Sequence, residues 1–100
     1  MSKSLIERRL TEVSQRLKRL REELAVLDEQ GQVFTEAAED ARVRSLVSET
    51  PIAHREYAQA QRHADAMDRT RRLLVDQIGE LSATQDKLLD RLLAADQPAR

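Results

Sequence analysis

Apolar residues in this chain follow two heptad patterns, separated by a short polar stretch. In the first half they alternate at spacings of four and three from Ile6 to Leu27, and smaller residues continue the same phase through Ala41. In the second half the same alternation runs from Ala53 to Ala95. This spacing is the a/d seam of a coiled coil. The pattern predicts two long helices.

The two seams mirror each other about residues 48–53. The numbers of facing residues add up to 101 or 102 throughout, as in the pairs Leu27 with Leu74, Leu24 with Ile78, and Ala41 with Ala60. Only two antiparallel arms of equal rise produce this pattern. We therefore predict an all-α fold, a long antiparallel two-helix coiled-coil hairpin.

Capping residues give the boundaries of the arms. Ser4, followed three residues later by Glu7, predicts the first N-cap, and Thr50 before Pro51 predicts the second. We expect a single hairpin over 1–100, with arm one at about 4–48, the turn at 49–52, arm two at about 53–94 and a frayed tail at 95–100.

Gly31 interrupts the first seam at an a position that faces Arg71. One interpretation is that the missing side chain leaves room for Arg71 to cross the seam; the other is a hinge at Gly31. Gln85 is a second polar seam residue on arm two. Polar seam residues specify helix alignment, so we predict that Arg71 and Gln85 fix the register.

Apolar residues near the turn lie off the seam, where one facing helix does not cover them. They either fold over the turn and are buried locally, or form a surface that binds a partner protein. The predicted partner-binding residues at the tip are Val43, Leu46, Val47, Glu49, Ile52 and Arg55.

Further off-seam apolar residues widen the apolar stripe of arm two. They predict self-association, most simply a homodimer that forms a four-helix bundle. The predicted oligomer interface comprises Leu73, Val75, Leu89 and Leu93. A domain-swapped dimer with an open turn has the same facing layers, so both arrangements fit.

Charge changes sign along arm one. Residues 1–21 carry seven basic and two acidic side chains, and residues 22–40 carry seven acidic and no basic ones. The basic segment, above all residues 8–21, suggests weak nucleic-acid binding as an alternative function. However, its arginines surround the helix and no aromatic residue interleaves with them, so we favour a solvated face.

Candidate chemistry is sparse. The chain has no cysteine, and its two histidines, His54 and His63, are nine residues apart and so lie on different helix faces. We expect no enzyme activity, no cofactor and no metal site. No apolar run has the length of a membrane span, and we expect a cytoplasmic protein without membrane contact.

Two resemblances suggest functions. The whole chain, rich in arginine and alanine, resembles short coiled-coil hairpin proteins of high-GC Gram-positive bacteria, which are mostly uncharacterised. Glu56-Tyr57-Ala58 and the heptad arm after them are similar to the second helix of the N-terminal coiled coil in Gre-type transcription factors. Such hairpins enter RNA polymerase and present a pair of acidic residues, where this chain has only Glu49.

The predicted function is therefore a non-enzymatic adaptor or scaffold that self-associates and binds a partner protein through the tip. The alternative that the second resemblance implies is a transcription regulator that inserts its hairpin tip into RNA polymerase.

Overall fold

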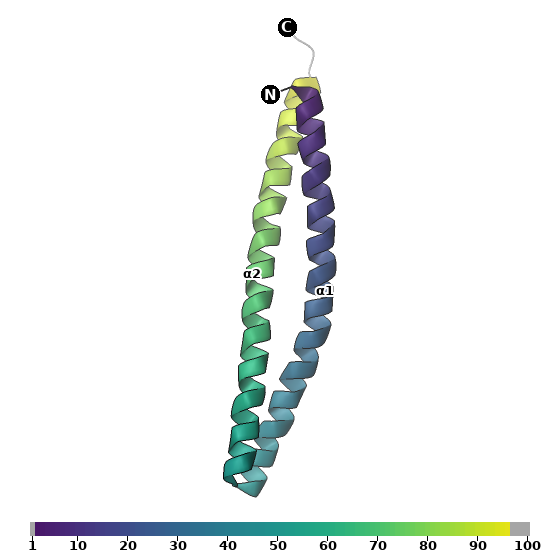
Figure 1. The fold of residues 1–100 in the computed structure, drawn as a ribbon. Helices are drawn as coiled ribbons and strands as arrows, with labels where there is room; N and C mark the ends of the chain where they lie inside the picture. The colour runs from purple at the N-terminus through teal and green to yellow at the C-terminus, as the bar shows by residue number, and fades with distance from the viewer. Residues whose placement is uncertain (1, 97–100) are drawn as a thin grey trace. The chain divides into compact units, whose positions relative to one another are not determined.

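The computed structural model describes residues 2–96. Two helices of 46 residues each, α1 (Lys3–Ser48) and α2 (Pro51–Asp96), make up nearly all of this range and pack against each other in opposite directions (Figure 1). Residues 2–96 contain no strand, so the prediction of an all-α antiparallel hairpin is confirmed. Neither helix has a segment long and apolar enough to cross a membrane over the described residues.

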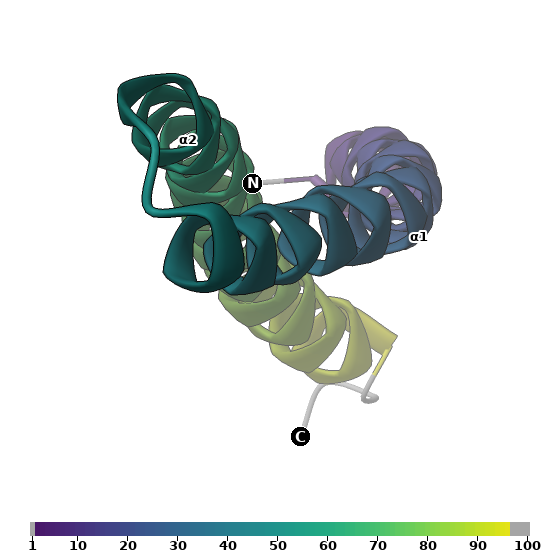
Figure 2. The same cartoon turned by 90° about the horizontal axis from the view of Figure 1, so that it is seen from below.

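The turn consists of two residues, Glu49 and Thr50 (Figure 2). The Thr50 hydroxyl accepts a hydrogen bond from the Ala53 N–H at 3.2 Å, which confirms the predicted N-cap. Pro51 is the first residue of α2, a position where its missing N–H leaves no helical bond unmade. The predicted turn at 49–52 was therefore two residues too long, because Pro51 and Ile52 are helical.

Glu49 ends α1 in a left-handed backbone conformation, with φ of 50°. Its N–H donates to the Ser45 carbonyl at 3.1 Å, which closes the last turn of the helix. Glycine normally takes this position because a side chain at positive φ crowds the backbone.

The outer ends of the helices differ from the prediction. Ser2, not Ser4, caps α1: its hydroxyl accepts a hydrogen bond from the Leu5 N–H at 3.2 Å. α2 continues to Asp96 instead of ending near residue 94, and Asp96 forms an ion pair with Lys3. Residues 95 and 96, predicted to fray, are thus helical, whereas residues 97–100 of that predicted tail lie outside the described range.

Contacts divide the chain into two compact units, each treated below by itself. We call Leu24–Leu73 the tip unit, since it contains the turn. The described residues up to Glu23 and from Leu74 onward form the terminal unit.

Large side chains fill the core of the terminal unit, which comprises Ile6, Leu17, Leu20, Leu74 and Leu88. Leu17 is 1% exposed. The polar seam residue Gln85 is part-buried, and its amide donates to the Ser14 hydroxyl at 3.0 Å. This bond satisfies Gln85 within the seam and pairs the two helices at one position, as expected of a register-fixing residue.

Small side chains fill the core of the tip unit, whose buried residues are Ala38, Ala41, Ser45 and Ala53. The buried Ser45 hydroxyl donates to the Arg42 carbonyl at 2.8 Å, so it is not left unsatisfied. Phe34 is the largest seam residue here, and its ring meets His63 edge-on at a centroid distance of 5.9 Å. The tip unit therefore buries much less apolar volume per layer than the terminal unit.

Candidate interaction surfaces

The tip patch is the set of off-seam apolar residues beside the turn, namely Val43, Leu46, Val47 and Ile52. Their exposed fractions run from 47% for Val43 to 81% for Val47. The expectation that they fold over the turn and become buried is wrong, because the turn is only two residues long and contributes no side chain to cover them. The tip patch is an exposed apolar surface.

Charged groups surround the tip patch. Glu49 and Arg55 are both exposed, as required of the residues predicted to contact a partner. Arg42 donates two hydrogen bonds to Glu39, at 3.0 and 2.6 Å. These bonds lower the pKa of the Glu39 carboxyl and raise the pKa of the Arg42 guanidinium. Both groups remain in solvent, so the pair contributes little to stability.

The residues of the predicted oligomer interface are also exposed, but they do not share one face. Val75, Leu89 and Leu93 lie within about 40° of one another around α2, given about 100° per residue. Leu73 precedes Val75 by two residues and so lies on nearly the opposite side of the helix. The predicted set therefore splits into a three-residue stripe in the terminal unit and a single residue in the tip unit.

Sequence reasoning missed two exposed residues of α1, Val26 and Val33, which are 52% and 63% exposed. They lie one heptad apart in the tip unit, on the outer side of α1. The signal that would have found them is their seven-residue spacing outside the a/d seam.

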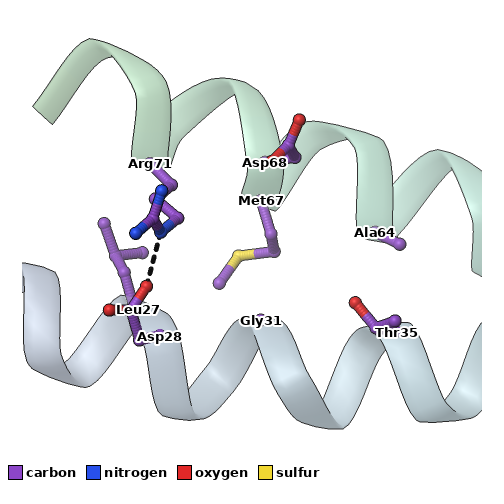
Figure 3. A pocket seen from close by; sticks show the side chains of 8 residues that line it. All are labelled: Leu27, Asp28, Gly31, Thr35, Ala64, Met67, Asp68 and Arg71. Atoms are coloured by element: carbon purple, nitrogen blue, oxygen red, sulfur yellow. Dashed lines mark hydrogen bonds and ion pairs between the residues drawn. The ribbon is translucent and has the colours of Figure 1, made fainter. Parts of the chain in front are cut away.

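A hollow of about 140 Å³ lies between the helices of the tip unit (Figure 3). Arg71 does not cross the seam there: its Nε donates to Asp28 Oδ1 at 2.6 Å. A Cβ on Gly31 would meet nothing within 4 Å, so the prediction that Gly31 makes room for Arg71 is wrong. α1 continues without interruption through Gly31, and a hinge there stays an untested interpretation.

The hollow is open to solvent, and its acidic residues Asp28 and Asp68 are both occupied, by Arg71 and by Arg72 respectively. Residues 2–96 contain no group of three metal-ligating side chains close enough to hold an ion.

No protein-family model, curated protein or solved structure matches this chain.

Proposed function

We propose that the protein is a non-enzymatic coiled-coil adaptor that self-associates and binds a partner protein through the tip patch. One observation carries the proposal: Leu46, Val47 and Ile52 are each more than half exposed within a few residues of the turn. Burying such a side chain contributes about 1.5–3 kcal/mol, so an exposed group of them is a strong site for protein contact.

The exposure of large apolar side chains also supports self-association. Among residues 2–96, eleven large apolar side chains are exposed, and they occur in both units. A two-helix hairpin buries little apolar surface by itself, so a second copy is the simplest way to cover part of it.

The test compares three forms of the purified, tagged protein: the wild type, Leu46→Ser/Ile52→Ser, and the control Val75→Ser/Leu93→Ser. The control changes exposed apolar residues in the terminal unit. Proteins captured from a bacterial lysate are identified by mass spectrometry, then purified and titrated calorimetrically. We expect the tip variant to weaken binding at least tenfold and the control to bind as the wild type does.

The same titration separates the adaptor from a transcription regulator. If the hairpin acts inside RNA polymerase, Glu49→Ala or Arg55→Ala removes binding and Leu46→Ser/Ile52→Ser has a smaller effect. Purified RNA polymerase is the binding partner used in that titration. Equal binding by the wild type and every tip variant would overturn the proposal.

A further inference from the structure

Exposed large apolar residues are concentrated on the tip unit. Seven of the eleven belong to it, although its core is built from small residues. Five of the seven lie on one side of the helix pair and define what we call the lateral face: Val26, Val33, Val47, Ile52 and Leu73.

A surface hollow of about 250 Å³ shows that these residues share a side. Its lining comes from both helices: Ala37, Ala41 and Arg44 from α1, and Glu56, Gln59, Ala60 and His63 from α2. Val33 precedes Ala37 by one helical turn, and Ile52 precedes Glu56 by one turn, so both flank the hollow. The other three are separated from these by whole heptads, which return to nearly the same helix side: Val26 lies seven residues before Val33, Val47 fourteen after it, and Leu73 twenty-one after Ile52.

The opposite side of the tip unit has one exposed large apolar residue, Leu46, which lies one heptad after Glu39. The hollow on that side, of about 370 Å³, is lined by three carboxylates, those of Glu39, Asp65 and Asp68. Most of the exposed apolar surface of the tip unit therefore lies on one side, which favours a single binding face over non-specific association.

Two rows of charge border the lateral face, and Asp40, one heptad after Val33, lies within it. On α1, Glu29 and Glu36 lie one heptad apart, one turn before and one turn after Val33. On α2, Arg62 and Arg69 lie one heptad apart, and Arg69 is one turn before Leu73. All four are exposed, and none of them forms an ion pair within the described residues.

We infer that the lateral face docks against the lateral face of a second copy, with α1 of each copy lying along α2 of the other. This inference rests on the self-association proposed above and names its surface and geometry. Two residues of the tip patch, Val47 and Ile52, belong to the lateral face and are covered in this dimer, whereas Val43 and Leu46 lie outside it and stay available to a partner protein.

The acidic row of α1 and the arginine row of α2 favour a second copy as the partner and determine which helices face each other in the dimer. With a twofold axis along the helices, the acidic row of each copy meets the arginine row of the other, and this contact occurs twice. Ala41 of α1 lies level with Ala60 of α2, so Arg69 is level with residues 32–33, between Glu29 and Glu36. The other face-to-face arrangement places α1 on α1, with acidic row on acidic row, and like charges oppose it.

The surface is large enough for a stable dimer. From Val26 to Val47 the face extends about 32 Å along α1 at 1.5 Å per residue. Two helices about 10 Å apart make it roughly 20 Å wide, or roughly 640 Å² per copy. The total for both copies, roughly 1,300 Å², is above the roughly 1,000 Å² expected of a specific interface.

The first test reverses the charge rows. Glu29→Arg/Glu36→Arg and Arg62→Glu/Arg69→Glu are prepared separately, mixed in equal amounts, and also combined in one chain. Sedimentation velocity over a concentration series gives the dimer Kd. We expect each double variant alone to dimerise about tenfold or more weakly than the wild type. The mixture and the combined variant are expected to recover wild-type affinity.

Weakening of each double variant alone, together with recovery in the combined variant, is specific to α1 lying along α2 of the other copy, because an α1-on-α1 dimer already opposes like charges in the wild type and in the combined variant. If each double variant dimerises like the wild type, or the mixture does not recover, the inference is overturned. A wild type that stays monomeric at high concentration would overturn both this inference and the self-association on which it rests.

The second test uses apolar residues that lie outside the tip patch. Val33→Glu/Leu73→Glu is compared with Leu89→Glu/Leu93→Glu in the terminal unit, and circular dichroism checks the helix content. All four positions are exposed, so the hairpin should fold in both variants. Loss of the dimer only in Val33→Glu/Leu73→Glu supports the inference. Loss only in the control keeps self-association but moves it to the terminal unit, and so refutes the lateral face.

Discussion

The two units use the same heptad scheme in opposite ways. In the terminal unit large residues such as Leu17 and Leu88 are buried, and four large apolar residues are exposed. In the tip unit the buried residues are alanines and a serine, whereas seven large apolar residues lie outside. Large apolar residues therefore contribute more to the core in the terminal unit and more to the accessible surface in the tip unit. We expect the tip unit to be the less stable of the two.

The largest expected effect comes from the core of the terminal unit. Leu17→Ala removes a side chain that is 1% exposed, and should lower the free energy of unfolding by about 2–5 kcal/mol. Ala41→Gly, at a buried layer of the tip unit, should cost only about 1–1.5 kcal/mol, mainly through helix propensity. Urea unfolding followed by circular dichroism measures both.

The matched control is Leu93→Ala, which makes the same chemical change at a residue 64% exposed and should shift stability by less than about 0.5 kcal/mol. Equal costs for Leu17→Ala and Ala41→Gly would contradict the contrast between the two cores.

A smaller effect of opposite sign is expected at the glycines, one in each unit. A Cβ at Gly31 or Gly79 meets nothing within 4 Å, and both lie inside helices. Gly31→Ala and Gly79→Ala should each raise the free energy of unfolding by up to about 1 kcal/mol, because alanine has the higher helix propensity. Thermal unfolding measures the change. Destabilisation by Gly31→Ala alone would show that the tip unit needs a glycine there.

The smallest effect concerns the exposed pair Glu39 and Arg42 in the tip unit. Hydrogen bonds from Arg42 lower the pKa of Glu39 in the folded state. The pair therefore contributes its stability above the unfolded pKa of a glutamate and loses it as the pH falls through the folded value. In an NMR titration, Glu39 should protonate at a higher pH in Arg42→Gln than in the wild type. An unchanged midpoint would show that the hydrogen bonds do not persist in solution.

Sequence reasoning was most successful where a pattern repeats. Two heptad seams of constant phase and a proline between them predicted both helices, their direction and the cap at Thr50, because helix period and capping are local properties. The prediction of Ser4 as the first cap failed because Ser2, two residues earlier, is an equally good capping residue.

Side-chain direction could not be predicted in the same way. Gly31 and Arg71 do face each other in the seam, yet the position of the guanidinium depends on Asp28, one turn away on the other helix. The lateral face went unnoticed because Val26 and Val33 look unremarkable singly, and only their side of the helix pair connects them with Ile52 and Leu73. The partner of a side chain and its exposure both depend on how the two helices pack, which the pattern of a single helix does not contain.

Pro51 also governs which chain a helix pairs with. If the turn straightened, α1 and α2 would become one continuous helix, and α2 would be free to pair with α1 of another molecule. Inside that helix Pro51 would have no N–H for the Val47 carbonyl and would disfavour helical backbone at Thr50, a cost of about 3 kcal/mol. The bond from Ala53 N–H to the Thr50 hydroxyl would be lost as well. Two exchanging chains incur these costs twice, so we expect Pro51 to keep each seam within a single polypeptide.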